Sequence, residues 1–364
     1  MSIEWIGRSP VRVLVVDDSA FMRNALARMI NSEEKFEVIG AACSGSEALA
    51  KVPELNPDLI TLDLEMPGLG GLETLRRIMH QFPRPVIVVS GIGEHDCQAA
   101  VTALSLGAFE YVPKKLASTT LEIAHIRENL ISKLRMAAES MNPAPEIPPR
   151  KPPVGCCAET RRFVAPAAIV AFGASTGGPK ALQEILSTLP ANLTIPALIV
   201  QHMPPGFIGP LAHRLGEACA IRVCEAVHLA PIEPAVAYLA PAGMHMTVQR
   251  LSHSRTCIWL DSEPSKHVHM PSIDILMQSV AEVYGNRAMG VILSGMGRDG
   301  TEGMKAIYAR GGMTVGQDQA TSLVYSMPRN CAESGVLDCI LSLSEIADAI
   351  VDASARGHAH SVSF

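Results

Sequence analysis

The sequence contains no apolar run long enough to cross a bilayer, and its first residues lack the basic-then-apolar order of a secretory signal. Its nine cysteines form no Cys-x-x-Cys pair, which is typical of a reducing compartment where most thiols are small core residues. Positive charge is not in excess, since 30 Lys and Arg stand against 36 Asp and Glu, and no helix-turn-helix pattern is present. We therefore expect a cytoplasmic protein with no direct membrane insertion and no nucleic-acid partner.

Prolines mark a boundary inside the chain. Residues 141–153 read Met-Asn-Pro-Ala-Pro-Glu-Ile-Pro-Pro-Arg-Lys-Pro-Pro, a composition that excludes helix and central strand and favours an extended linker. On both sides of it, apolar strand-like runs alternate with amphipathic helical patterns, as in parallel α/β domains. We predict a first domain over residues 10–138, a linker over 139–165 and a second domain over 166–355.

The first domain contains five repeats of strand and helix. Strict alternation of this kind predicts a flavodoxin-like, doubly wound sheet of five parallel strands. The predicted strands are residues 11–16, 37–41, 59–62, 86–89 and 110–112, and the predicted helices are residues 20–30, 47–55, 72–80, 98–106 and 121–138.

The second domain is predicted to be another doubly wound, mostly parallel α/β domain, with buried strands over residues 167–172, 197–200 and 289–293. Three short, closely spaced segments interrupt the alternation, and the turn residues between them predict an antiparallel ribbon attached to the sheet. These segments are residues 236–239, 246–249 and 256–260.

Carboxylates follow two of the predicted strands of the first domain. Asp17 and Asp18 end the first strand and Asp63 ends the third, and these strand ends are neighbours in a doubly wound sheet. Three crowded carboxylates would repel each other, and Mg²⁺ resolves that repulsion. Ser90 and Lys114, past the fourth and fifth strands, could reach an anion bound there. The alternative is that the acidic residues only cap helices, which explains neither Asp63 nor the convergent lysine.

These residues stand in motifs, at residues 15–19, 62–68, 89–90 and 107–114, that resemble the response-regulator receiver domain. The resemblance implies that Asp63 accepts a phosphoryl group from a sensor histidine kinase. It implies that Asp18, Asp63 and the backbone carbonyl of Glu65 ligate Mg²⁺, with Asp17 in the outer shell, Ser90 as the hydroxyl switch and Lys114 as the phosphate contact.

The chain departs from the receiver pattern at two places. Lys115 follows Lys114 where receivers usually have proline, and residues 68–71 lack the usual aspartate before the last glycine. Because a cis bond before a residue other than proline costs about 3 kcal/mol, we expect a trans bond and an altered turn there.

A Gly-x-Ser-x-Gly motif follows the first strand of the second domain, at residues 173–178. Small residues around a sharp strand-to-helix turn leave the hydroxyl of Ser175 exposed beside free backbone N–H groups, which suits a nucleophile. A serine that only caps the helix is the alternative from this motif alone. His202 and Asp299 also lie just past buried strands, so three catalytic residue types should meet at one edge of the sheet. This combination favours catalysis.

The three side chains predict a serine hydrolase mechanism that needs no cofactor. Ser175 is the nucleophile, His202 is the base that takes its proton, and Asp299 holds the imidazole. The tetrahedral oxyanion needs hydrogen-bond donors. We expect them to be the backbone N–H of Thr176 and a second group from the loop that holds Met296.

Residues 173–178, 201–206, 269–274 and 294–300 resemble the catalytic domain of chemotaxis protein-glutamate methylesterases, and a receiver joined to it resembles the CheB family. The resemblance implies hydrolysis of methyl esters on glutamate side chains of methyl-accepting chemoreceptors, and deamidation of glutamine at the same site. The domain order suggests that the first domain, in a monomer, covers the edge that holds Ser175 until it is phosphorylated.

Two other functions compete with this interpretation. The second domain could be an output domain that binds a ligand or nucleic acid, although the acidic charge disfavours nucleic acid. It could instead bind a nucleotide through the glycine-rich turn, although that turn lacks both Gly-x-Gly-x-x-Gly and the lysine of a P-loop.

Several other polar residues have ordinary explanations. His245, His267 and His269 could suggest a metal site, but no His-x-x-x-His or cysteine pair accompanies them, so we expect loop or pocket-wall roles. Asp274 is expected to cap the helix that it opens. Arg298 could orient substrate carboxylates or lie in solvent.

Overall fold

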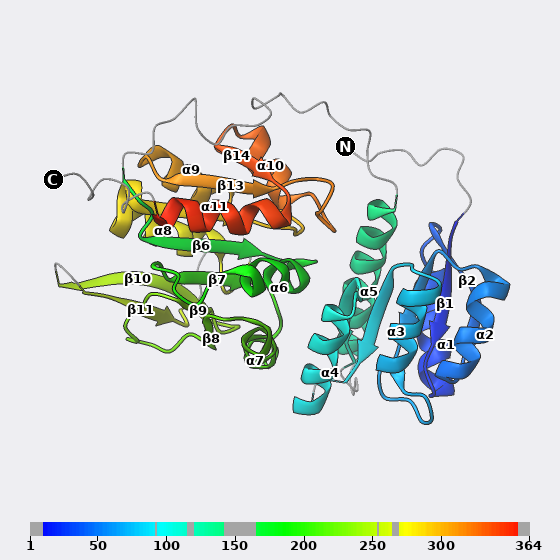
Figure 1. Cartoon of the computed structure of the whole chain (residues 1–364). Coiled ribbons are helices and arrows are strands. Elements are labelled where there is room, and N and C mark those ends of the chain that lie inside the picture. The colour runs from blue at the N-terminus through cyan, green and yellow to red at the C-terminus, as the bar shows by residue number, and fades with distance from the viewer. Residues whose placement is uncertain are drawn as a thin grey trace. The chain divides into compact units, whose positions relative to one another are not determined.

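The computed structural model describes residues 10–91, 93–114, 120–141, 165–252, 255–263 and 269–355. The chain divides into two compact units, Met1–Pro145 and Glu146–Phe364, and each has its own parallel sheet (Figure 1). The proline-rich part of the expected linker lies outside the described residues. None of the described helices combines the length and the apolar character that a bilayer span requires.

The first unit alternates strand and helix as predicted. Its elements are β1 (Val11–Val16), α1 (Ala20–Asn31), β2 (Phe36–Ala42), α2 (Gly45–Leu55), β3 (Leu59–Leu62), α3 (Gly71–Gln81), β4 (Val86–Ser90), α4 (Glu94–Ser105), β5 (Glu110–Pro113) and α5 (Thr120–Ser140). The five parallel strands lie in the order β2-β1-β3-β4-β5, which confirms the flavodoxin-like sheet. The order reverses between β1 and β3, so the residues after these two strands are neighbours at a switch point.

The second unit is also an α/β domain. Its elements are β6 (Ile169–Ala174), α6 (Gly178–Thr188), β7 (Ala197–Gln201), α7 (Ile208–Ala218), β8 (Arg222–Glu225), β9 (Val236–Leu239), β10 (His245–Ser252), β11 (Arg255–Asp261), α8 (Ile273–Tyr284), a 3₁₀ turn (Gly285–Arg287), β12 (Ala288–Ile292), α9 (Thr301–Ala309), β13 (Met313–Gln317), α10 (Met327–Glu333), β14 (Cys339–Leu341) and α11 (Leu343–Ala355). Seven strands form one parallel sheet in the order β14-β13-β12-β6-β7-β9-β8.

The antiparallel ribbon is smaller than predicted. Of the three predicted segments, β10 and β11 pair antiparallel, whereas β9 is a parallel strand between β7 and β8 in the main sheet. The physical reason is burial: all four residues of β9 are buried, as in a strand covered on both faces, while β10 becomes exposed towards its end. The three-segment ribbon was therefore a wrong prediction for residues 236–239.

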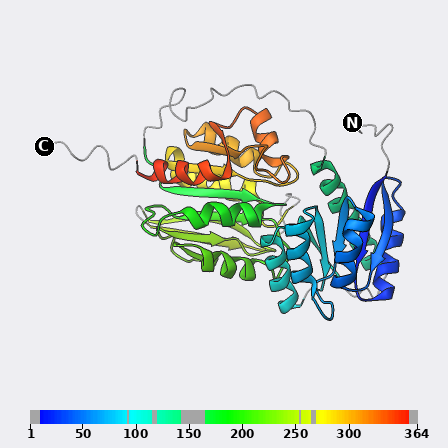
Figure 2. The same ribbon diagram turned by 45° about the vertical axis from the view of Figure 1, so that its right-hand side comes forward.

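Helices cover both faces of this sheet, as Figures 1 and 2 show. On one face α6 packs against α7 and α11, and on the other α8 packs against α9. The central strands β6, β7 and β12 are buried along their whole length. Their carboxyl ends consequently form a rigid edge from which polar side chains can project.

Candidate functional site

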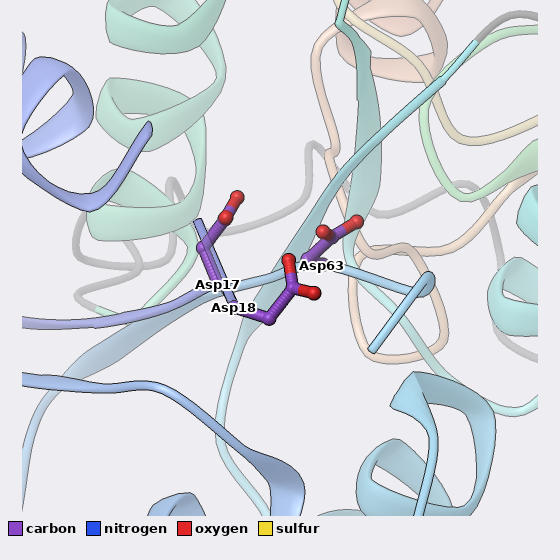
Figure 3. Close-up of side chains that lie close together, drawn as sticks. All are labelled: Asp17, Asp18 and Asp63. Atoms are coloured by element: carbon purple, nitrogen blue, oxygen red, sulfur yellow. The ribbon is translucent and has the colours of Figure 1, made fainter. Parts of the chain in front are cut away.

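The first unit holds an acidic pocket at the switch point of its sheet. Figure 3 shows Asp17, Asp18 and Asp63 side by side, and one carboxylate oxygen from each lies within 4.8 Å of the other two. The Nζ atom of Lys114 lies 2.6 Å from Oδ2 of Asp17 and 2.7 Å from Oδ2 of Asp63. The structure thus brings together the four charged side chains that the sequence analysis assigned to this edge.

Burial makes this pocket favourable for a cation. Asp17 and Asp63 are almost wholly buried, while Asp18 is exposed to solvent. Burial raises the pKa of Asp63 above its ordinary value, and the hydrogen bond and charge of Lys114 only partly oppose this shift. Because one lysine faces three carboxylates, negative charge remains in excess. Oxygen donors of this kind fit Mg²⁺.

Two further residues expected at this pocket are Ser90 and Glu65. Ser90 ends β4, is fully buried, and its hydroxyl has no hydrogen-bond partner in the described part of the chain. The backbone N–H of Glu65 donates to Oδ1 of Asp63 at 3.3 Å, so the main chain of Glu65 lies next to this carboxylate. The expected trans bond after Lys114 involves Lys115, which lies outside the described residues.

The second unit places Ser175, His202 and Asp299 after β6, β7 and β12, which are adjacent strands. The turn after β6 is sharp because Gly177 has φ of 82°, a left-handed conformation that favours glycine. Main-chain hydrogen bonds join the three loops: His202 N–H donates to Ala174 O at 3.0 Å, and Ser175 N–H to Ser294 O at 3.1 Å. The sheet itself therefore sets the spacing between these loops.

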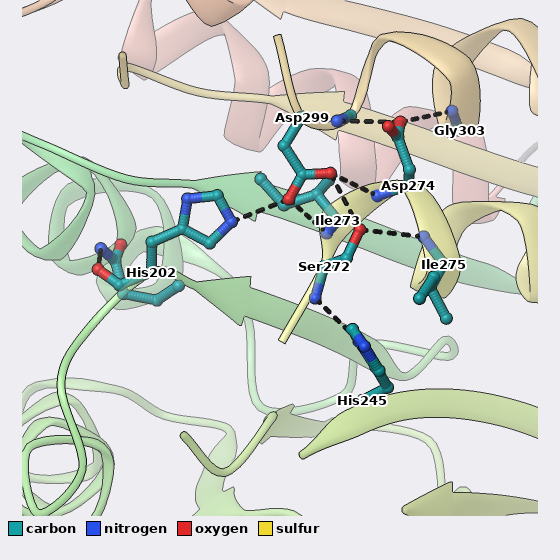
Figure 4. A network of polar contacts seen from close by, with 10 residues as sticks. His202, His245, Ser272, Ile273, Asp274, Ile275, Asp299 and Gly303 are labelled. Atoms are coloured by element: carbon teal, nitrogen blue, oxygen red, sulfur yellow. Dashed lines mark hydrogen bonds and ion pairs between the residues drawn. The ribbon is translucent and has the colours of Figure 1, made fainter. Parts of the chain in front are cut away.

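The carboxylate of Asp299 accepts four hydrogen bonds (Figure 4). Its Oδ2 accepts from Nε2 of His202 and from Ile273 N–H, both at 2.8 Å. Its Oδ1 accepts from the Ser272 hydroxyl and from Asp274 N–H, both at 3.0 Å. Burial alone would raise the pKa of Asp299, but the hydrogen bonds from His202, Ile273 and Asp274 outweigh it and hold this pKa well below its ordinary range.

The hydrogen bond to Asp299 defines the tautomer of the neutral His202 ring. An ionised carboxylate only accepts hydrogen bonds, so Nε2 carries the proton and Nδ1 is the basic atom. Among the residues that the structure describes, this buried Nδ1 has no hydrogen-bond partner. The Ser175 hydroxyl is therefore not bonded to the imidazole in this state, although the two main chains are held together.

Thr176, next to Ser175, and Met296, next to Gly295, are the two residues whose segments are expected to serve the oxyanion. Thr176 is buried, and its carbonyl accepts a hydrogen bond from the Ser294 hydroxyl at 2.8 Å. Met296 is 49% exposed and lies on a loop that is joined to the start of α10, because the Gly295 carbonyl accepts from Met327 N–H at 2.9 Å. Arg298 is exposed.

Sequence reasoning missed the supports of Asp299. Ser272 caps α8 by accepting from Ile275 N–H, while its own N–H donates to Nδ1 of the buried His245 at 3.2 Å. The cap expected of Asp274 is corrected: the N-cap of α8 is Ser272, while Oδ1 of Asp274 accepts from Gly300 and Gly303 at the start of α9. Nothing in the linear pattern links these segments, because their contact depends on how α8 packs beside α9.

A second imidazole lies against the site. The ring of His269 stacks on that of His202, with 4.2 Å between ring centroids and 24° between the planes. Burial lowers the pKa of His269, and the neighbouring His202 lowers it further. His269 lies outside the helices and strands, shortly before α8, which agrees with the loop role among the two expected for it. His267 lies outside the described residues.

The CheB methylesterase family matches residues 170–350, and the response regulator receiver domain matches residues 13–125. The protein-glutamate methylesterase/protein-glutamine glutaminase 2 of Nitratidesulfovibrio vulgaris is 41% identical over 364 residues, which cover 94% of this chain and 99% of that protein. The chain belongs to the CheB family. The protein-glutamate methylesterase/protein-glutamine glutaminase of Pyrococcus abyssi is 39% identical, and the match covers 94% of this chain and 93% of that protein.

A solved structure supports the same membership. The catalytic domain of the Thermotoga maritima CheB methylesterase matches with a TM-score of 0.50 and 34% identity, covering 51% of this chain and 98% of that one. The family resemblance and the two α/β folds predicted from the sequence are therefore confirmed. CheB membership also explains why a receiver domain and a methylesterase domain occur in one chain.

Proposed function

We propose that this chain is a phosphorylation-activated hydrolase that removes methyl esters from glutamate side chains of chemoreceptors. The observation that carries the proposal is the His202–Asp299 pair, in which Nδ1 of His202 has no hydrogen-bond partner among the described residues, while β7, which His202 follows, pairs with β6, which Ser175 follows. Family membership supplies the substrate class. The protein would act in the cytoplasm, as a monomer.

The reaction starts when Nδ1 of His202 takes the proton of the Ser175 hydroxyl and Oγ attacks the ester carbonyl carbon. Hydrogen bonds at an unliganded site are often longer than in the substrate complex, so the Ser175 hydroxyl would bond to the ring once substrate binds. The imidazolium that forms is stabilised by Asp299, which stays ionised.

The tetrahedral oxyanion then accepts hydrogen bonds from the N–H of Thr176 and from the loop of Met296. As the intermediate collapses, the imidazolium returns its proton to the leaving oxygen, and methanol departs. Water repeats the sequence on the acyl-serine, which leaves a free glutamate and restores Ser175. A glutamine amide follows the same route with ammonia as the leaving group.

The first unit would regulate this chemistry. Asp18, Asp63 and the Glu65 carbonyl would hold Mg²⁺, with Asp17 in its outer shell, and the ion would neutralise the charge of the incoming phosphoryl group. Asp63 would accept that group from a sensor histidine kinase. Lys114 already contacts Asp63 and would pair with the phosphate, and the unpartnered Ser90 hydroxyl would turn towards it. The catalytic unit would be inhibited until this occurs.

The test is methanol release from a methylated cytoplasmic fragment of a chemoreceptor, measured with and without a small phosphodonor and Mg²⁺. We expect release that rises with the phosphodonor, and Asp63→Asn should abolish both labelling and this rise. Labelling that survives Asp63→Asn would refute the phosphoacceptor assignment. An absence of methanol in every condition would refute the esterase itself.

A further inference from the structure

The side chain of Gln201 joins the nucleophile loop to the base loop. Gln201 ends β7 directly before His202 and is only 2% exposed. Its Nε2 donates to the carbonyl oxygen of Ser175 at 2.9 Å and to that of His202 at 3.1 Å. Both partners can only accept, so the orientation of the carboxamide is determined by its contacts.

The other end of the carboxamide is in an unfavourable environment. Oε1 of Gln201 is buried without a hydrogen-bond partner among the described residues, and it lies so close to Gly178 that a Cβ there would come within 2.0 Å. A buried acceptor without a partner costs about 1–3 kcal/mol. Such a group in a native structure needs an explanation, and the two contacts made by Nε2 supply one.

These contacts orient a backbone N–H. The Ser175 carbonyl accepts from Gly178 N–H at 2.8 Å as well as from Gln201, so two donors hold it. Because a peptide bond is planar and trans, the Ser175 oxygen and the Thr176 N–H point in opposite directions within one plane. Holding the oxygen therefore fixes the direction of the N–H. The next peptide plane is held by the Ser294 hydroxyl on Thr176 O.

We infer that Gln201 is a positioning residue for ester hydrolysis. Its carboxamide holds the Ser175–Thr176 peptide so that the Thr176 N–H points at the developing oxyanion, and it keeps the His202 main chain in register with the nucleophile. The inference rests on the function proposed above, because it requires Ser175 to be the nucleophile. An oxyanion donor acts only on the transition state, so the effect belongs in kcat.

The test uses the full-length chain with phosphodonor and Mg²⁺, and the methylated receptor fragment as substrate. Gln201→Met keeps the length and volume but has no donor, and we expect kcat to fall roughly tenfold to a hundredfold while KM changes less than about twofold. The control is Thr314→Val, which removes a fully buried hydroxyl bonded to Asp338 at the amino-terminal end of β13, away from the catalytic edge. The control should keep its kcat.

Three results would overturn the inference: a kcat of Gln201→Met within twofold of the wild type, a rise in KM that accounts for the whole loss, or an equal loss in Thr314→Val. A crystal structure of Gln201→Met should show the Ser175–Thr176 peptide plane rotated. An unmoved plane with a normal kcat would overturn this inference and leave the proposed function standing. If wild type and Ser175→Ala released methanol equally, the proposed function would fail and this inference with it.

Discussion

Removing the side chain of Asp299 should destabilise the second unit as well as stop catalysis. Asp299→Ala takes away the acceptor of Ile273 N–H, Asp274 N–H and the Ser272 hydroxyl, in addition to that of His202. A buried donor left without a partner costs about 1–3 kcal/mol. The Asp299 side chain is 9% exposed, so water can enter the vacated space and the lower end of that range applies.

Three such donors lower the free energy of unfolding by about 3 kcal/mol. For a unit of this size that corresponds to a fall in Tm of roughly 6–12 °C. Asp299→Asn should behave differently, because the amide keeps the shape and one oxygen acceptor. It should fold with a smaller loss of stability while kcat falls by roughly 10⁴, the effect of this exchange in Ser-His-Asp hydrolases, since the imidazole loses its negative partner.

The assays are thermal unfolding of the full-length chain and methanol release at saturating substrate. The matched control is Asp338→Ala, which removes an acceptor from Thr314 N–H (2.9 Å) and from the Thr314 hydroxyl (2.8 Å) at the opposite end of the sheet. The control should also unfold earlier but keep its kcat. An unchanged Tm in Asp299→Ala, or a near-normal kcat in Asp299→Asn, would refute the reasoning.

Three further predictions concern the hydroxyl of Ser90, the charge of Lys114 and the effect of pH on Asp299. Ser90→Ala should not lower the free energy of unfolding, because its buried hydroxyl has no hydrogen-bond partner among the described residues, yet activation of methanol release by the phosphodonor should disappear. Lys114→Met should destabilise the first unit by roughly 3 kcal/mol by leaving Asp17 and Asp63 unpaired, and thermal unfolding should show that Mg²⁺ recovers much of this loss. Because the folded-state pKa of Asp299 is depressed, its stabilisation is present above the unfolded pKa of about 3.9 and is lost as pH falls through the folded value. Urea unfolding should thus give a constant difference between wild type and Asp299→Asn from about pH 5 to 8, and a smaller one only below about pH 4.

The local patterns of the sequence were sufficient for much of the fold. β1 and β3 begin and end at the predicted residues, because each is a short, mostly apolar run that stops at an aspartate. The segment over residues 236–239 was misplaced because four buried residues look alike in a parallel strand and in a ribbon. Only the pairing of β9 with β7 and β8 separates these cases, and pairing is not a local property.

For the candidate site too, local patterns could be predicted and contacts between distant segments could not. Ser175, His202 and Asp299 could be identified because each stands just after a buried strand, where parallel sheets gather functional residues. The contacts of Asp274 with α9 and of Gln201 with two carbonyl groups were not foreseen. These contacts join segments that are distant in sequence, and they form only when helices and loops have packed.

The central claim is that the hydroxyl of Ser175 attacks the ester after His202 takes its proton. The most direct measurement is methanol release from the methylated receptor fragment by Ser175→Ala, with folding checked by thermal unfolding. The account predicts a loss of about a thousandfold or more at an unchanged Tm. Turnover equal to the wild type would contradict it, and only the phosphate-accepting role of the first unit would remain.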